Sequence, residues 1–305
     1  MIGMEVRTGY AEANNISIYY EDMGELHHPV ILLVCGMSVQ LIHWPDDFCQ
    51  KIVAQGYRVI RFDNRETGLT TRSHVKAPPP IMQSFVRYRL GMEVHAEYNL
   101  DTLVLDAVSL LDVLEIQQAH WVGFSMGGMI AQLAAAHYQQ RVLSLTSIMS
   151  STNERHLPGP RWDVLLALIN PPKDKSEKAI VDAGVAIFNK LQSPKYKVHD
   201  DVLAFDVRRA IARARRPMAG PMHQMAILST GGFSKRLRQI NAPTLVIHGD
   251  SDPLVRLQGG KHSAKSIPNA LLEVIPGMGH DFPPGLVDRL TGLITGHIST
   301  NHAVA

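Results

Sequence analysis

Cysteine is scarce in this chain of 305 residues, which has only Cys35 and Cys49. Two cysteines cannot form a four-ligand zinc site alone, and they do not suggest the disulfide framework of an oxidising compartment. Long apolar runs are also missing, because stretches such as 30–35 are far too short to cross a bilayer. The first residues lack the apolar core and cleavage site of a signal peptide. We therefore expect a cytoplasmic protein without a membrane segment.

An excess of charge of one sign is absent as well. The chain has 30 Lys and Arg against 28 Asp and Glu, a formal net charge of +2 with histidine neutral. This balance gives no electrostatic reason to expect a nucleic acid or a membrane as partner. We find no Walker loop, no Gly-x-Gly-x-x-Gly and no His-Glu-x-x-His, so no nucleotide cofactor and no metal is predicted.

Apolar runs typical of buried strands alternate along the chain with segments of helical periodicity. Strands are expected at 16–20, 30–35, 57–62, 119–123, 142–149, 243–248 and 270–275. Helices are expected at 45–55, 100–114, 126–137, 256–266 and 286–297. This rhythm predicts an α/β fold, a mostly parallel sheet of about eight strands with helices on both faces.

Two stretches interrupt the rhythm. Residues 74–98 contain three consecutive prolines and have no clear shape, whereas 150–232 shows helical periodicity and no clear strand. We predict a core made of 1–149 and 233–305, split by a helical cap of 150–232.

Two groups of side chains in the predicted cap need an interpretation. The basic group, which we interpret as a solvated helix face, consists of Arg208, Arg209, Arg213, Arg215 and Arg216. Met218, Met222 and Met225 either line an apolar site or simply pack in the core, since methionine adapts to irregular apolar surroundings.

Residues 123–127 read Gly-Phe-Ser-Met-Gly, with an apolar strand before them and a helix after them. In the Gly-x-Ser-x-Gly pattern a sharp turn holds the serine hydroxyl above the sheet, and Gly123 and Gly127 leave room for that turn. The Met126 N–H then lies at a helix N-terminus, where negative charge is favoured. The motif predicts Ser125 as a nucleophile; the alternative is an ordinary tight loop between a strand and a helix.

A serine hydroxyl needs a base to take its proton, and in this kind of site the chain order is serine, acid, histidine. Asp252 and His280 follow the last two predicted strands, so both lie at the carboxyl edge of the sheet. We prefer Asp252 to Asp250, which is placed to bond its own turn. We prefer His280 to His262, whose helical setting suggests a surface residue.

Hydrolysis of a carbonyl compound needs a second N–H donor for the oxyanion. It should come from the loop after the strand 30–35, where Gly36 lets the chain bend closely. We expect the Met37 N–H to serve, although a plain turn has the same local sequence.

Several segments together resemble one superfamily. They are 34–37, 44–45, 61–68, 123–128, 249–252 and 277–280. They are similar to the α/β-hydrolase superfamily, and most similar to its carboxylesterase branch that includes the aclacinomycin methylesterases. The resemblance implies a triad of Ser125, Asp252 and His280, oxyanion donors at Met37 and Met126, and no cofactor.

The sequence departs from the patterns of related hydrolases at three points. Cys35-Gly36 stands where most relatives have His-Gly, and 63–68 reads Asp-Asn-Arg-Glu-Thr-Gly in place of Asp-x-Arg-Gly-x-Gly. The His-Gly-Gly-Gly of hormone-sensitive-lipase-type esterases is absent, which argues against that group.

We expect a serine hydrolase that cleaves small to medium acyl or methyl esters through an acyl-enzyme. Its expected partner is this small-molecule ester, and the protein is expected to be a monomer or a homodimer. The same triad could instead act on a carbon–carbon bond, open a lactone or catalyse perhydrolysis. A non-catalytic ligand-binding protein on this scaffold is the alternative from another class.

Overall fold

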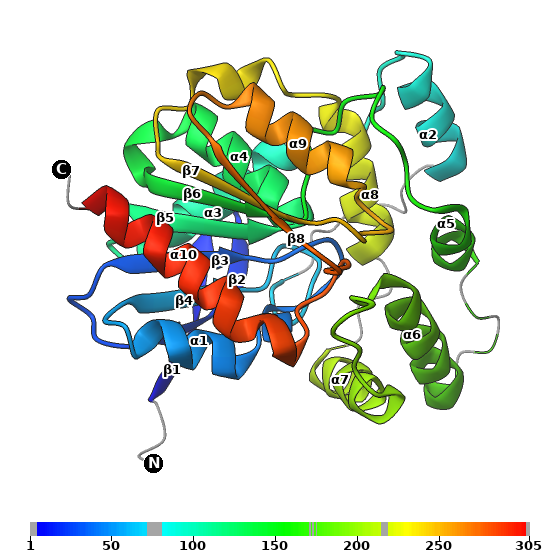
Figure 1. Cartoon of the computed structure of the whole chain (residues 1–305), viewed down its shortest axis with the longest axis horizontal. Coiled ribbons are helices and arrows are strands. Elements are labelled where there is room, and N and C mark those ends of the chain that lie inside the picture. Colours follow the sequence, from blue (N-terminus) through cyan, green and yellow to red (C-terminus); the bar gives the residue numbers. More distant parts are fainter. Residues whose placement is uncertain are drawn as a thin grey trace.

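The computed structural model describes residues 5–71, 81–170, 172, 174, 176–214 and 219–302. Its strands form one sheet in the order β1-β2-β4-β3-β5-β6-β7-β8 (Figure 1). They are β1 (Val6–Ala13), β2 (Ile16–Met23), β3 (Val30–Val34), β4 (Arg58–Phe62), β5 (Ala119–Phe124), β6 (Val142–Ile148), β7 (Thr244–Gly249) and β8 (Leu271–Ile275). β2 pairs antiparallel with both β1 and β4, and all the other neighbouring strands pair parallel. The predicted mostly parallel sheet of about eight strands is confirmed.

The sequence did not predict β1, which is the edge strand. β1 pairs with β2 from Val6 opposite Met23 to Ala13 opposite Ile16, and half of its residues are exposed. Its buried side chains are small alanines, so no apolar run marks the strand. The signal that could have revealed it is the two-residue loop of Asn14 and Asn15, whose φ angles of 46° and 62° suit a tight hairpin.

Helices cover both faces of the sheet. The core helices are α1 (Asp46–Val53), α3 (Leu100–Val113), α4 (Met126–His137), α9 (Leu257–Ser266) and α10 (Val287–His302). Four short 3-10 turns are η1 (Leu41–His43), η2 (Gln139–Arg141), η3 (Arg236–Gln239) and η4 (Pro284–Leu286). α1 and α10 lie on one face, and α3 and α4 lie with α9 on the other (Figure 1).

Strand β3 shows why the central strands read as unbroken apolar runs. Leu32 and Val34 belong to the apolar cluster beneath α3 and α4, whereas Ile31 and Leu33 belong to the cluster beneath α1 and α10. Successive side chains of a strand point to opposite faces, so a strand between two helical layers is apolar at every position. All five β3 residues are buried.

Five more helices lie outside this sandwich. α2 (Ile81–Arg89) falls in the stretch 74–98, whose residues 74–80 lie outside the described residues. α5 (Trp162–Ile169), α6 (Glu177–Leu191), α7 (Asp200–Arg213) and α8 (Ala219–Thr230) lie between β6 and β7, and α5, α6 and α7 gather at one end of the sheet (Figure 1). We refer to the stretch 150–232 as the insertion; its role as a cap with its own boundaries stays a prediction.

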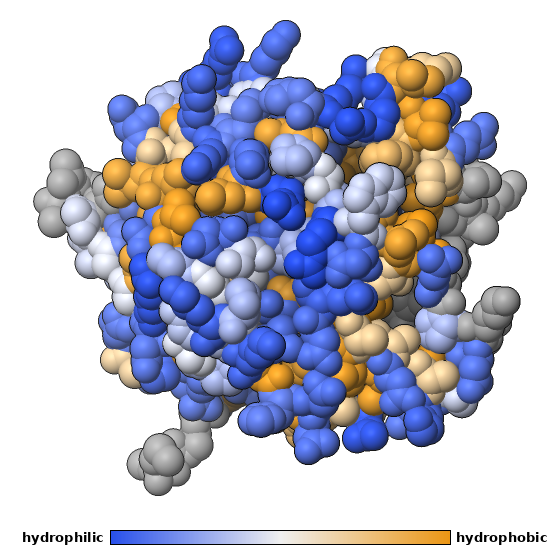
Figure 2. Space-filling model, turned by 45° about the vertical axis from the view of Figure 1, so that its right-hand side comes forward, coloured by the Kyte–Doolittle hydropathy of each residue, from blue (hydrophilic) through white to orange (hydrophobic). Residues whose placement is uncertain are grey.

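The helical end of the molecule exposes many apolar side chains, which gather on the right-hand side of the surface in Figure 2. The large exposed apolar side chains of α2, α5 and α7 are Met82, Phe85, Val86, Trp162, Leu166, Leu168, Ile169, Val202 and Phe205. Within the described part of the chain, no helix has the length and apolar character needed to cross a bilayer.

Candidate active site

Ser125 stands in the turn that joins β5 to α4. Its φ of 55° and ψ of −123° are unfavourable for a residue with a side chain. Two hydrogen bonds hold this turn: the Ser125 N–H donates to the Ile148 carbonyl at 2.9 Å, and the Ser150 hydroxyl donates to the Ser125 carbonyl at 2.7 Å. Neighbouring β6 and the loop after it therefore stabilise the strained serine.

The two glycines of the motif allow backbone to pack against backbone. A side chain at Gly123 would collide with the Gly127 carbonyl, and one at Gly127 would collide with the backbone of Val34 and Cys35 at the end of β3. Because a Cβ has no space at either position, the start of α4 approaches the sheet closely. The sharp turn at Ser125 depends on that approach.

The structure brings Ser125, His280 and Asp252 together. His280 Nε2 lies 3.1 Å from the Ser125 Oγ, and His280 Nδ1 lies 2.7 Å from the Asp252 Oδ2. The other carboxylate oxygen of Asp252 accepts hydrogen bonds from the N–H groups of Leu254 and Val255 at 2.8 and 2.9 Å. Since a carboxylate only accepts, Nδ1 carries the proton and Nε2 is free to accept from the serine hydroxyl.

Asp250 and His262, the alternatives to Asp252 and His280, form hydrogen bonds with other residues. Asp250 is exposed, and its Oδ1 accepts from the Gly277 N–H at 2.7 Å, which lowers the pKa of the carboxyl. His262 on α9 bonds the Thr152 hydroxyl through Nδ1 at 2.8 Å, and its ring lies edge-on to His156.

His248, which lies next to the Asp252 loop, was not predicted from the sequence as a site residue. Its Nε2 lies 2.7 Å from the Val255 carbonyl, so it donates there, and 3.5 Å from the Asp252 Oδ2. Burial lowers the pKa of His248, so the ring is neutral at neutral pH. The signal for it was its place at the end of the strand that leads to Asp252.

The loop after β3 lies against Ser125. A side chain at Gly36 would contact the Phe124 ring and the Ser125 Cβ, so the backbone before Met37 borders the serine directly. Met126 is the first residue of α4, and the first N–H groups of a helix have no intrahelical acceptor. The backbone beside Ser125 thus comes from two elements, the loop after β3 and the first turn of α4.

The insertion holds the loop that carries His280. The His280 N–H donates to the Leu191 carbonyl at 2.8 Å, and the Gly279 N–H donates to the Ser193 Oγ at 2.8 Å. The Ser193 N–H donates to Asp281 at 3.0 Å, and burial raises the pKa of the Asp281 carboxyl. The chain between α6 and α7 is therefore bonded to the loop on both sides of His280.

The interpretation of the basic group as a solvated face is wrong for Arg213. Its Nη1 lies 2.7 Å from Asp63 and 2.8 Å from Gln40, and its guanidinium lies 4.9 Å from the centre of the Tyr19 ring. Arg213 anchors the end of α7 to the core. It provides the counter-charge that the fully buried Asp63 carboxylate needs.

The remaining members of the two groups are placed as follows. Arg208 is exposed and Arg209 pairs with Asp46 at 3.1 Å, whereas Arg215 and Arg216 lie outside the described residues. Met222 and Met225 are buried and pack in apolar clusters, and Met218 lies outside the described residues.

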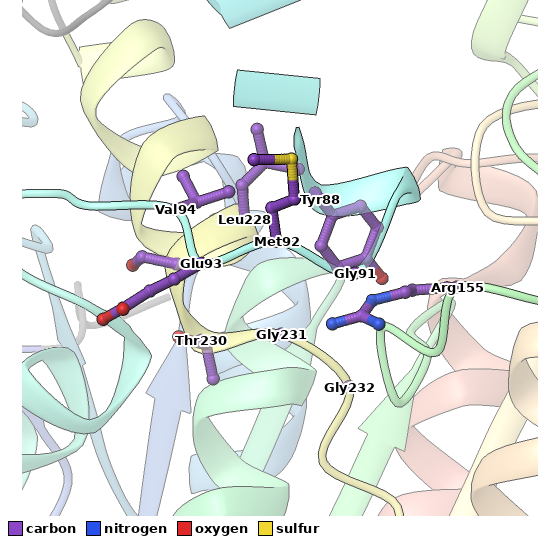
Figure 3. A pocket seen from close by; sticks show the side chains of 11 residues that line it. Tyr88, Gly91, Met92, Glu93, Val94, Arg155, Leu228, Thr230, Gly231 and Gly232 are labelled. Carbon is purple, nitrogen blue, oxygen red and sulfur yellow. The ribbon is translucent and has the colours of Figure 1, made fainter. Parts of the chain in front are cut away.

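A separate cavity of about 320 Å³ opens between α2 and the end of α8 (Figure 3). Tyr88, Met92, Arg155 and Leu228 line it, and the Tyr88 hydroxyl donates to the Asn153 carbonyl. Both stretches that interrupt the strand rhythm contribute to this cavity. Its lining does not include Ser125, Asp252 or His280.

Among the described residues, no three His, Cys, Asp or Glu side chains are grouped so that they could hold a metal ion. Both cysteines are buried, and burial raises the pKa of the Cys35 thiol well above its ordinary value. Cys35 donates instead to the Gln40 carbonyl within the loop after β3, with 3.5 Å between sulfur and oxygen.

Fold and site together define a hydrolase scaffold, and residues 30–283 match the model of the α/β hydrolase fold family. The chain belongs to this family, which confirms the resemblance. The chain is similar to two rhodomycin D methylesterases. It is 24% identical to DnrP of Streptomyces peucetius and 25% identical to DauP of Streptomyces sp. (strain C5). Each alignment covers 93% of this chain and 95% of the relative. The meta-cleavage product hydrolase CumD of Pseudomonas fluorescens IP01 shares the fold, with a TM-score of 0.75 and 21% identity over 96% of this chain and 97% of that chain.

Proposed function

We propose that this protein hydrolyses carboxylic esters with Ser125 as nucleophile, His280 as general base and Asp252 as the acid that orients the histidine. The observation that carries the proposal is the pair of contacts at His280, 3.1 Å to Ser125 and 2.7 Å to Asp252. Distances of this size suit proton transfer from the hydroxyl to the ring.

The reaction proceeds in two halves. His280 Nε2 takes the hydroxyl proton while the Ser125 Oγ attacks the ester carbonyl, and the Met37 and Met126 N–H groups stabilise the oxyanion. The imidazolium returns its proton to the alcohol oxygen as the carbon–oxygen bond breaks, which leaves an acyl-enzyme. His280 then deprotonates a water molecule whose oxygen attacks the acyl carbonyl carbon. The bond between that carbon and the Ser125 Oγ breaks, the acid leaves, and His280 returns the proton to Ser125.

The substrates are esters of small to medium acyl groups, methyl esters among them. The names of the two methylesterase relatives support this substrate class. The length of the insertion supports it as well, because a long insertion favours an enclosed apolar site, and such sites bind small molecules.

The test compares wild-type protein with Ser125→Ala on p-nitrophenyl esters from acetate to octanoate and on aryl methyl esters. We expect turnover by the wild type and a loss of at least about 10⁴-fold in kcat for the variant, because the nucleophile is gone. A fluorophosphonate should label the wild type at Ser125. Failure of labelling, together with no turnover in the whole panel, would refute the proposal.

A further inference from the structure

His223 lies on α8 and contacts two loops of the core. The Ser38 N–H donates to its Nδ1 at 3.1 Å, and its Nε2 lies 2.8 Å from the Arg65 carbonyl oxygen. The side chain is fully buried, and 185 positions separate it from Ser38 in the sequence. One histidine of the insertion thus joins the loop after β3 to the loop after β4.

The partners of the ring define its protonation state. A carbonyl oxygen only accepts, so Nε2 carries the hydrogen, and Nδ1 must be bare to accept from Ser38. Burial lowers the pKa of His223 to about 4, which keeps the ring neutral at neutral pH. A neutral ring with its hydrogen on Nε2 can therefore accept from the Ser38 N–H and donate to the Arg65 carbonyl at the same time.

The contact with Ser38 fixes one end of a very short segment. Ser38 has a φ of 65°, so the chain turns sharply there. At the other end the Asn64 side chain donates to the Cys35 carbonyl at 3.0 Å. Only Gly36 and Met37 lie between the two anchors.

This arrangement makes the direction of the Met37 N–H depend on both anchors. Gly36 lies against the Ser125 Cβ, so a small rotation of the segment would move the Met37 amide relative to the reacting carbonyl. An oxyanion donor is effective only when it is held in place before the reaction, and loss of one donor costs about 10²–10³-fold in kcat.

We propose that His223 is a positioning residue for ester hydrolysis, holding the Ser38 amide so that the Met37 N–H is directed at the oxyanion. This inference rests on the proposed function. His223 does not touch the substrate; it acts through the backbone of the loop after β3.

Two substitutions separate the two bonds of the ring. In His223→Asn the side-chain oxygen takes the place of Nδ1 and accepts from Ser38, whereas in His223→Gln the amide nitrogen takes the place of Nε2 and donates to Arg65. We expect His223→Gln to lower kcat by about 10- to 100-fold, because the Met37 donor is misplaced but not removed. His223→Asn should stay within about threefold of the wild-type kcat, and KM should change by less than about twofold in both, as expected when only the transition state is affected.

Thermal unfolding of both variants provides the control for a merely structural role. If the two variants lose kcat equally, or if His223→Gln retains kcat within twofold, the inference is wrong. A large rise in KM for His223→Gln with unchanged kcat would also overturn it, because it would place His223 in substrate binding.

Two measurements do not depend on ester turnover. Hydrogen exchange of the segment 35–40 should become faster in His223→Gln and stay unchanged in His223→Asn. Nitrogen NMR of the wild type should find His223 neutral with its hydrogen on Nε2; a hydrogen on Nδ1 would refute the contact even if neither variant folded. A wild type that hydrolyses no ester but gives these results would refute the proposed function and keep the contact.

Discussion

The loops at the carboxyl edge of the sheet and the insertion 150–232 contribute to the site in different ways. The loops after β3, β5, β7 and β8 hold the side chains and amides proposed to react. The insertion supplies groups that bond loops at this edge: Ser193 at the His280 loop, Arg213 at the Asp63 loop, which follows β4, and His223 at the Ser38 loop. The sheet thus places the residues proposed to react, and helices that are remote in the sequence supply hydrogen bonds to the loops around them.

The largest expected effect belongs to the sheet-edge loops. Asp252→Asn should lower kcat by about 10⁴-fold, because an amide next to Nδ1 stabilises the wrong tautomer of His280. The measurement is steady-state hydrolysis of a p-nitrophenyl ester. Asp250→Asn is the matched control in the same loop, and it should change kcat by no more than a few-fold because Asp250 is exposed and contacts Gly277. Equal losses in the two variants would contradict the assignment of the acid.

The next largest effect is expected on stability, and its measurement tests whether the insertion is a structural part of the core. Arg213→Met should lower the free energy of unfolding by about 3 kcal/mol, because it leaves the buried Asp63 carboxylate without its counter-charge. Arg209→Met, one turn earlier on α7, should cost less than about 0.5 kcal/mol, because its pair with Asp46 is exposed. Denaturant unfolding monitored by circular dichroism measures both. Equal effects would mean that Arg213 does not anchor α7.

A smaller effect is expected from the titration of two histidines, the half-buried His43 of the core and the buried His223 of the insertion. Burial lowers the pKa of His43, in η1 of the core, and of His223, in the insertion, to about 4. The unfolded chain binds these protons first, near pH 6.5, so the free energy of unfolding is highest above that pH and falls as the pH is lowered toward 4. Between pH 7 and pH 5 each histidine should account for a loss of about 2 kcal/mol.

Urea unfolding at a series of pH values measures this slope. His43→Gln and His223→Asn should each remove about half of the loss that the two histidines share, whatever the stability of each variant at pH 7. A slope that neither substitution changes would show that neither histidine ring governs the acid sensitivity.

Much of the core could be predicted because its physical signals are local. A parallel strand between two helical layers is apolar at every position, as in β3, and amphipathic helices such as α3 show their own period. The edge strand β1 was missed because its exposed residues and small alanines carry neither signal.

The site was predictable to the extent that it follows chain order. Ser125, Asp252 and His280 each follow a strand of the same sheet, and parallel strands bring their carboxyl ends together. His248 and His223 were not predicted, because nothing local distinguishes a buried, bonded histidine from the others among the fifteen. Arg213 was assigned to a solvated face because its partner Asp63 is 150 positions away.

The sequence by itself determined the class of fold and the place of the proposed nucleophile, since both depend on periodicity and on a short turn. The tertiary structure alone decided what supports that turn and its partner loops, because hydrogen bonds between distant segments leave no regular spacing in the chain. The bonds from Ser150 to Ser125, from Gly279 of the His280 loop to Ser193 and from Ser38 to His223 are of this kind. Each gives a hydrogen-bond partner to a polar group that burial would otherwise leave without one. The partner has to be near in the folded structure and can be far away in the sequence.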